Sequence, residues 1–400
     1  MRERDPRFYV SPLNTLPQVT EGTSLPSKVT LRDLTLREGP QAAGVGFTPE
    51  DKVEIARQMD EAGFTQIEVG FGAEDREAII SMKRAGVKAQ LIVLVPAFRP
   101  HWQEAIATAL DAGVEIIQVL VRSSDQQLAM LDLDRDETLG LVDKAVAYAV
   151  DRGAEGVCFS TSFATLADPG FLTRMHKAAG DAGASHVSIA DSTGVATPEA
   201  MSFLVGSVRQ VIDVPICVHV HNDFGLAVAN ILASLKAGAS MADVSMLGLG
   251  ERAGNAPSEE VVLALEGLYG VDTGIRLERL RGLAQTVSRL AGFPMASNKA
   301  VVGENVFAQK LELHVQVTSR DPRLFEPFSP DLVGHRRELK LGSGSGPIAV
   351  QAKLSELGLE VPEEHIGELV TWVNQEALAK KRSVEDGEFR VEAEKLVVER

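Results

Sequence analysis

Two histidines, His219 and His221, stand two residues apart at the end of an apolar, β-branched run that reads PICVHVHN. Because side chains alternate along a strand, both imidazoles face the same side. Two neutral imidazoles on one face supply half of the ligands that a divalent metal ion needs. An isolated pair of this kind could equally be core histidines bonded to backbone groups, so the surrounding elements decide between the two interpretations.

Other polar side chains stand at the ends of other apolar runs. They are Arg37, Glu38 and Gln41 after the first run, Glu68 in the second, Asp191, Ser192 and Thr193 after the sixth, and Glu251, Arg252 and Asn255 after the last. A carboxylate oxygen, two imidazoles and an amide oxygen would form an open site for a hard or borderline divalent cation, with water or substrate in the remaining positions. Taken singly, Arg37 could be a surface ion-pair partner and Glu38 a solvated carboxylate.

Short apolar runs alternate with longer amphipathic segments, which predicts a parallel α/β fold. The predicted strands are Val29–Leu34, Gln66–Gly70, Lys88–Val95, Glu115–Val121, Gly156–Phe159, His186–Ala190, Ile216–His221 and Ala242–Met246. Helix starts such as Thr48-Pro49, and glycines directly after several helices, delimit the segments between them. Eight such units over roughly 240 residues match a closed (β/α)8 TIM barrel, whose active sites lie at the carboxyl ends of the strands. A doubly wound sheet would usually carry a Gly-x-Gly turn after its first strand, and here that turn reads Arg-Glu-Gly-Pro.

The chain is longer than one barrel, so a second region is required. Its 400 residues, 44% of them hydrophobic, are predicted to form an N-terminal arm over 1–27, the barrel over 28–270, a linker and post-barrel subdomain over 271–345, and a mostly helical C-terminal subdomain over 346–400. The run Gly342–Pro347 favours a flexible linker over a loop that meets a ligand.

Charge and cysteine content limit the partners and the compartment. A net charge of −16 argues against nucleic acid or an anionic membrane as the main partner. Cys158 and Cys217 fall inside predicted strands, which indicates reduced core thiols in a cytoplasmic protein. No apolar run is long enough for a membrane helix, and the opening residues lack the apolar core of a signal peptide.

Four segments, LREGPQ, IEVGFG, HVHNDFGLAVAN and LGLGERAGNA, together resemble the DRE-TIM metallolyase superfamily. The last two are similar to its Claisen-condensing branch, which holds the homocitrate, isopropylmalate, citramalate and Re-type citrate synthases. The Arg-Glu form of the first segment is more like homocitrate synthases. The resemblance covers about residues 28–345 and implies an acyltransferase that uses a divalent metal (Mg, Mn or Zn). Acetyl-CoA, or a related acyl-CoA, would condense with a 2-oxo acid and release CoA and a 2-substituted malate.

The resemblance also implies roles for residues at the barrel mouth. Glu38, His219 and His221 match the family's metal ligands, and Asn255 matches the position of an additional ligand. Arg37 matches the catalytic arginine, which would meet the alkoxide charge that develops when the enolate attacks.

Further matches concern the substrate and the proton. Glu68 matches the active-site glutamate, and Ser192 stands where relatives use Thr to hold the substrate carboxylate. We expect Gln41 and Thr193, at the same mouth, to bind substrate as well. His314 lies at the position of a catalytic histidine that relatives carry after the barrel and extend into a neighbouring subunit's active site. The resemblance therefore implies a homodimer.

Several positions depart from the family pattern. Phe325 stands where a Tyr is expected, Gln309 where a His is usual and Glu312 where a Gly is usual, and Gly342–Gly346 replaces the usual Gly-Lys-His-Ser-Gly. These differences leave carbonyl activation intact and put the deprotonation step in question.

The side-chain pocket differs too. The segment Ser160–Leu166 lacks the acidic and basic groups that relatives have after the fifth strand, and its Phe163 and Leu166 favour an apolar or aromatic substrate tail. Arg122, where relatives usually have a small residue, would bind a carboxylate or phosphonate, or else pair with Asp125. We therefore expect an unusual 2-oxo acid or a changed deprotonation step.

Two alternatives to a condensing enzyme stay open at this point. A carbon-carbon lyase of the hydroxymethylglutaryl-CoA type would share the metal and the arginine, but it normally lacks the post-barrel segment and uses a Cys that is absent from LGLGERAGNA. A non-catalytic homologue would account for the missing Tyr and His.

Overall fold

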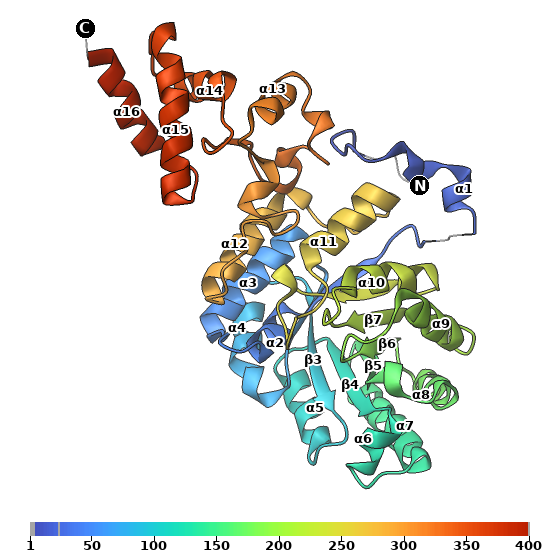
Figure 1. Cartoon of the computed structure of the whole chain (residues 1–400). Helices are drawn as coiled ribbons and strands as arrows, with labels where there is room; N and C mark the ends of the chain where they lie inside the picture. Colours follow the sequence, from blue (N-terminus) through green and yellow to red (C-terminus); the bar gives the residue numbers. More distant parts are fainter. Residues whose placement is uncertain (1–4, 23–24, 399–400) are drawn as a thin grey trace. The chain divides into compact units, whose positions relative to one another are not determined.

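Eight parallel strands close into a barrel in the order β1 to β8, in a computed structural model that describes residues 5–22 and 25–398 (Figure 1). The strands are β1 (Thr30–Asp33), β2 (Gln66–Gly70), β3 (Gln90–Pro96), β4 (Ile116–Arg122), β5 (Gly156–Ser162), β6 (His186–Asp191), β7 (Ile216–Val220) and β8 (Met241–Val244). The predicted TIM barrel is confirmed, and each predicted strand is present with ends that differ by a few residues.

Helices follow the strands and form the outer layer of the barrel. They are α3 (Pro49–Ala62), α4 (Arg76–Arg84), α5 (Trp102–Asp111), α6 (Asp125–Ala129), α7 (Arg135–Asp151), α8 (Pro169–Asp181), α9 (Pro198–Arg209), α10 (Ala227–Lys236), α11 (Ser258–Leu263) and α12 (Leu280–Leu290). The predicted start of α3 is a capping box in which Thr48 and Asp51 bond to each other's backbone amides. Its predicted end is Gly63, which has a left-handed φ of 100°. A single short turn, α2 (Thr35–Glu38), follows β1 directly and brings Arg37 and Glu38 to the mouth.

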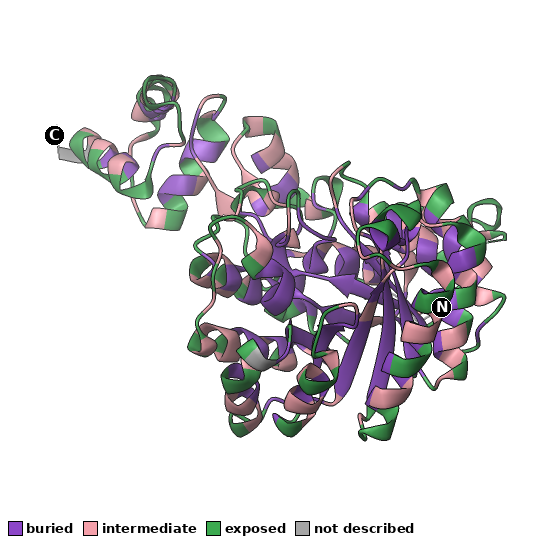
Figure 2. Cartoon of the chain, turned by 90° about the horizontal axis from the view of Figure 1, so that it is seen from below, coloured by how far each residue is buried: buried purple, intermediate pink, exposed green. Residues whose placement is uncertain are grey.

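The interior of the barrel is unusually polar. The strands are buried along their length (Figure 2), yet Arg32 and Cys158 are 0% exposed, Asp243 is 1% exposed and Gln118 is 2% exposed. Most TIM barrels fill these positions with branched apolar side chains. A charged pair in such a place costs several kcal/mol of desolvation per ion, so its geometry has to be complete.

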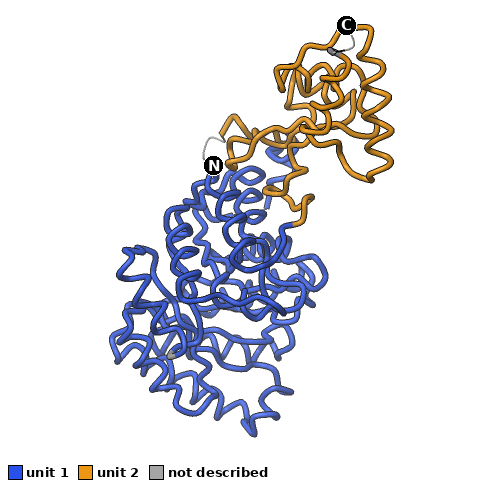
Figure 3. The backbone as a smooth tube through the Cα atoms, turned by 90° about the vertical axis from the view of Figure 1, so that its left-hand side faces the viewer, with its two compact units in different colours: residues 1–4, 12–295 blue, residues 5–11, 296–400 orange. Residues whose placement is uncertain are grey.

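The chain divides into two compact units (Figure 3). Among the described residues, unit 1 holds 12–295 and unit 2 holds 5–11 and 296–398. Unit 1 includes the short helix α1 (Pro17–Thr20), and unit 2 includes α13 (Glu312–Arg320), α14 (Pro347–Leu357), α15 (Ile366–Lys380), α16 (Asp386–Val398) and the two-residue strands β9 (Ala308–Gln309) and β10 (Glu338–Leu339). The finer boundaries predicted from the sequence stay a prediction, and residues 1–4 and 23–24 of the predicted arm lie outside the described residues.

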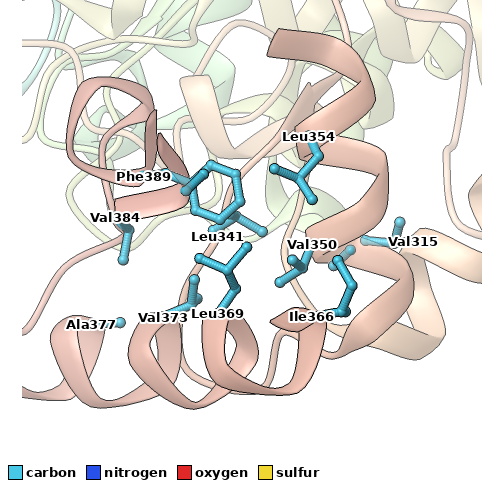
Figure 4. Close-up of a cluster of buried hydrophobic side chains, with 12 residues drawn as sticks. Val315, Leu341, Val350, Leu354, Ile366, Leu369, Val373, Ala377, Val384 and Phe389 are labelled. Carbon is cyan, nitrogen blue, oxygen red and sulfur yellow. The ribbon is translucent and has the colours of Figure 1, made fainter. Parts of the chain in front are cut away.

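Unit 2 has a hydrophobic core of its own (Figure 4). It is formed by Val315, Leu341, Ala349, Val350, Leu354, Ile366, Leu369, Val373, Ala377, Val384, Phe389 and Ala393. Phe389 and Leu369 are fully buried at its centre. The prediction that the C-terminal region is mostly helical is confirmed.

The segment Gly342–Gly346 is a fixed turn, and the prediction of a flexible linker is wrong. Ser345 is buried and donates through Oγ to the Lys310 carbonyl at 3.0 Å, and the Gly344 amide donates to Asn374 Oδ1 at 2.8 Å. Glu312 accepts from the amides of Gly346, Ile348 and Ala349 at 3.1, 2.8 and 3.1 Å. Its carboxylate thus satisfies the free amides at the N-terminus of α14, a favourable place for a negative charge. Among the described residues, no helix is long and apolar enough to cross a membrane.

Candidate metal and active site

Three predicted ligands converge at the carboxyl end of the barrel. Glu38 comes from α2, His219 from β7 and His221 from the residue after β7, and one ligand atom from each lies within 4.8 Å of the others. The Nε2 atoms of His219 and His221 are 3.2 Å apart, and His219 Nε2 is 3.8 Å from Glu38 Oε1. All three side chains are buried. The sequence prediction that these residues meet is confirmed.

The protonation states of this cluster suit a cation. Burial, together with the neighbouring His219, lowers the pKa of His221 to about 3, so the His221 ring is neutral at pH 7. Burial opposes the ionisation of Glu38, but the Arg37 guanidinium and the two neighbouring histidines together outweigh it, and the pKa of Glu38 falls to about 2. Metal ligands must be deprotonated to bind. A neutral imidazole and a carboxylate whose donor atoms face one another therefore fit a divalent ion.

Asn255 forms a β-bridge with His221 and adds an unsatisfied oxygen beside the cluster. Its Nδ2 donates to the Leu249 carbonyl at 3.1 Å, whereas its buried Oδ1 has no hydrogen-bond partner among the described residues. Leaving a buried acceptor unpaired costs about 1–3 kcal/mol, which a bound cation would offset. The backbone at Gly250 passes so close to Asn255 that a Cβ at this position would lie 2.1 Å from Asn255 Nδ2, and glycine leaves the room for this approach. This supports Asn255 as an additional ligand.

A buried ion pair holds His219 from below. Arg32 donates through Nε to Asp243 Oδ1 at 2.6 Å and through Nη2 to Oδ2 at 2.7 Å, and Asp243 Oδ2 lies 3.2 Å from His219 Nδ1. Burial raises the pKa of Asp243, but the charge of Arg32 and the hydrogen bonds from His219 and Arg32 together outweigh it and keep the pKa well below its usual value. An ionised Asp243 accepts the Nδ1 proton of His219, which leaves Nε2 free to bind a metal.

Sequence analysis missed Arg32 and Asp243. The available signal was that each occupies an inward-facing position of a predicted strand, where a charge needs a partner. The two are register neighbours on β1 and β8. Arg32 Nη1 also bonds to Gln118 Oε1, so one guanidinium positions an amide at the cavity wall and, through Asp243, the candidate metal ligand His219.

Arg37 is fixed beside the three ligands by two carboxylates. It donates to Glu38 Oε1 through Nη1 and to Glu68 Oε2 through Nη2 at 3.2 Å. Its Nε lies 3.0 Å from Glu68 Oε1 in an ion pair, without the geometry of a hydrogen bond. The guanidinium is also 5.7 Å from the centre of the Phe71 ring. Only 7% of Arg37 is exposed, so a planar cation is held rigidly at the edge of the site.

A cavity of about 210 Å³ opens above these residues. It is lined by Arg37, Glu38, Gln41, Phe71, Leu94, Gln118, Leu120, Ser160, Ser162, Phe163, Ala190, Ser192, His219, His221, Glu251 and Arg252. Two of the predicted substrate-binding residues, Gln41 and Ser192, therefore face it. In the amide orientation that satisfies its neighbours, Gln41 donates to Glu251 at 2.8 Å and accepts from Arg37 at 3.2 Å.

Other predicted substrate contacts do not line this cavity. Thr193 and Arg122 are outside its lining, and the Ser192 hydroxyl already accepts a bond from the Phe163 amide at 2.9 Å. Phe163 faces the cavity, but Leu166 is 51% exposed and does not, because it belongs to a 3-10 turn beyond the end of β5. Leu166 does not shape the cavity as expected.

The structure also gives the surroundings of Asp125 and His314. Asp125 is not the partner of Arg122, since it is bound by Arg135 Nε at 2.8 Å and Nη2 at 2.7 Å. His314 lies in α13 of unit 2, and its ring is 4.5 Å from the ring of Phe325. Its relation to the metal cluster stays a prediction.

Comparison with known proteins agrees with this geometry. Residues 28–287 match the HMGL-like family model, and residues 301–382 match the model described as homocitrate synthase post-HMGL domain-like. A homocitrate synthase AksA of Methanopyrus kandleri is 41% identical over 93% of this chain and 91% of its own length. A probable 2-isopropylmalate synthase of Ignicoccus hospitalis is 42% identical over 84% of each chain. Among solved structures, an HMG-CoA lyase from Brucella melitensis has a TM-score of 0.59 and 22% identity over 66% of this chain and 99% of its own, a likeness of fold alone.

We expect the cluster to bind one divalent ion per chain. Each of His219→Ala and His221→Ala removes one imidazole, so each should bind Mn²⁺ or Zn²⁺ at least about 100-fold more weakly than the wild type. Loss of a residue that only bonds to a ligand typically lowers metal affinity by about 10- to 100-fold, and loss of the ligand itself should lower it more. Titration calorimetry and elemental analysis of dialysed protein measure this. His101→Asn, an exposed histidine whose left-handed backbone suits Asn, is the control. Normal metal content in either alanine variant would refute the assignment.

Asp243→Asn tests the support of His219. The amide cannot hold the Nδ1 proton as a carboxylate does, so metal affinity should fall by about 10- to 100-fold. The single change also leaves Arg32 buried without its counter-charge, which destabilises by about 3–5 kcal/mol. The double variant Arg32→Met with Asp243→Asn removes that charge. Denaturant unfolding should show stability recovered in the double variant while metal affinity stays low, and recovery of both would mean that Asp243 has no specific role toward His219.

Proposed function

We propose that this chain, which belongs to the HMGL-like family and to its branch of condensing synthases, condenses acetyl-CoA or a related acyl-CoA with a 2-oxo acid. Water then hydrolyses the thioester of the adduct, so the products are CoA and a 2-substituted malate. The observation that carries the proposal is the buried cluster of Glu38, His219 and His221 beside the fixed Arg37, at the floor of a cavity on the carboxyl side of the barrel.

A divalent ion bound by this cluster would supply Lewis acidity toward the keto group of the 2-oxo acid. The residues of the chain do the remaining work of positioning. Arg37 presents a planar cation where negative charge develops on the keto oxygen, and Glu68 holds that cation in place before the reaction. The interaction is strongest in the transition state, because a neutral carbonyl gains little from a guanidinium.

Removal of the thioester α-proton needs a base within hydrogen-bond reach. Glu68 is held by Arg37 through an ion pair and one hydrogen bond, and the cavity-lining Glu251 is bonded to Arg252 at 2.9 Å. His314 is our proposal for the proton-transfer residue, supplied from the post-barrel segment of the second chain of a homodimer. Phe325, which contacts the His314 ring, cannot donate or accept the proton that a Tyr would handle there.

The compartment and the metal are part of the proposal. Both cysteines are free and buried, which fits a reducing cytoplasm. One carboxylate, two imidazoles and one amide oxygen suit Mg, Mn or Zn.

The cleavage of a hydroxyacyl-CoA is the runner-up activity. The HMG-CoA lyases among the solved structures resemble the barrel at 21–24% identity, in matches that cover about two thirds of this chain. The match of residues 301–382 to a post-barrel domain of homocitrate synthases favours condensation instead.

Thiol release decides among these functions. The full-length protein is incubated with acetyl-CoA, a panel of 2-oxo acids and Mg, Mn or Zn, and free CoA is measured with a thiol reagent. We expect CoA release that requires both a 2-oxo acid and the metal and that stops with a chelator. Acetyl-CoA formation from a hydroxyacyl-CoA, without any condensation, would identify a lyase, and no turnover in either direction would identify a non-catalytic homologue.

Arg37→Lys should act on turnover more than on affinity. Lysine keeps the charge but loses the planar fork that bonds Glu38 and Glu68, so kcat should fall by about 100- to 1,000-fold with little change in KM. Steady-state kinetics with the preferred 2-oxo acid measure both constants. Arg57→Lys, an exposed arginine on α3, is the matched control and should behave as the wild type. A change confined to KM would assign Arg37 to substrate docking.

A further inference from the structure

Arg122 occupies the last position of β4 on the face of the strand that lines the site. Side chains alternate along a strand, and Gln118 and Leu120, the preceding residues of the same parity, both line the cavity. Arg122 is also the register partner of Ser162 on β5, another lining residue. Its backbone therefore stands one step above the described cavity wall, at the mouth.

No acidic side chain in the described part of the chain forms an ion pair with Arg122. Its half-buried guanidinium lies 4.6 Å from the centre of the Phe98 ring, and its buried Nε has no hydrogen-bond partner. Among the residues that the structure describes, Arg122 forms neither an ion pair nor a hydrogen bond through its side chain. Neighbouring cations differ, since Arg37 is bound to Glu68 and Arg252 to Asp223 at 2.9 Å.

An unpaired guanidinium in a partly buried place is costly unless an anion arrives. The guanidinium carbon of Arg122 lies over the Phe98 ring, a cation–π contact that holds the group beside an aromatic side chain. A planar fork of this kind suits the bidentate binding of a carboxylate, phosphate or phosphonate. The aromatic platform and the absent counter-charge together describe a prepared anion site.

We propose that Arg122 binds a second anionic group at the far end of the 2-oxo acid, so the preferred substrate has a short tail that ends in a carboxylate or a phosphonate. This inference rests on the condensing function proposed above. The cavity of about 210 Å³ admits a short tail, and on the path from the metal cluster toward Arg122 it presents the hydroxyls of Ser160 and Ser162. Leu166, which favoured an apolar tail in the sequence, lies outside the cavity.

The substrate panel gives the first test. CoA release is measured for the metal-loaded wild type with 2-oxoglutarate and 3-phosphonopyruvate as anionic-tailed acids and with pyruvate, 2-oxobutyrate and 2-oxoisovalerate as neutral-tailed acids. We expect kcat/KM to be highest for one of the two anionic-tailed acids, and the better of them identifies the terminal group. Preference for a neutral-tailed acid would overturn the inference while the condensing function stands. If none of the five acids supported CoA release, the condensing function itself would have failed.

Arg122→Ala gives the second test, with Arg122→Gln as a variant that keeps the length of the side chain. We expect kcat/KM for the preferred anionic-tailed acid to fall by about 30-fold or more, which is the smallest loss typical of removing one partner of a buried charge pair. For pyruvate, kcat/KM should change by less than about 3-fold. Arg99→Ala, an exposed arginine on the loop after β3, is the matched control and should leave both values unchanged.

Two results would overturn the assignment. Equal losses for anionic-tailed and neutral-tailed acids would make Arg122 a structural residue. A raised KM for acetyl-CoA, with the KM of the 2-oxo acid unchanged, would mean that Arg122 binds a phosphate of the coenzyme. Calorimetric titration of the preferred acid in the presence of Mg²⁺ and without acetyl-CoA separates the two ligands directly, and there the loss of affinity in Arg122→Gln supports the proposal.

Discussion

The ion pair between Arg32 and Asp243 joins the first strand of the barrel to the last. The two residues are register partners on β1 and β8, the seam at which the sheet closes on itself. Two parallel N–H···O bonds of 2.6 and 2.7 Å hold the pair. Replacing such a buried pair with apolar residues is often neutral or stabilising, so stability alone is a weak reason for its presence. Its geometric effect is clearer, because the same carboxylate reaches His219 and the same guanidinium reaches Gln118.

The site is therefore built in two tiers. The lower tier consists of Arg32 and Asp243, whose opposite charges neutralise each other and whose side chains are buried from solvent. The upper tier, Glu38, His219, His221 and Arg37, has its donor atoms turned toward the cavity. Rigid support from strands suits catalysis, since a metal or an oxyanion partner has to be held within a fraction of an ångström of the productive position. The loops above the strands then determine which substrate fits, and Arg122 and Phe98 stand at that level.

Much of this could be predicted from the sequence, for a physical reason. Alternation of apolar runs with capped helices depends on local chemistry, so all eight strands were found, and chemical residues at strand ends follow from the geometry of a parallel barrel. Pairing across the seam was not found, because Arg32 and Asp243 are 211 residues apart and only the register brings them together. The turn at Gly342–Gly346 was mistaken for a linker because its anchors, Glu312 and Asn374, lie far away in sequence.

The positions of the ligands along the chain have a consequence for folding. Glu38 follows the first strand and Asn255 follows the last, so the proposed metal site has contributions from both ends of the barrel sequence. Contacts of such long sequence separation form late, because the intervening chain must be ordered first. During synthesis, Arg32 cannot pair with Asp243 until β8 has been made. A chain that stops before β8 lacks both Asp243 and Asn255. A complete set of ligands thus exists only in a closed barrel, and metal uptake would report the final step of assembly rather than an early one.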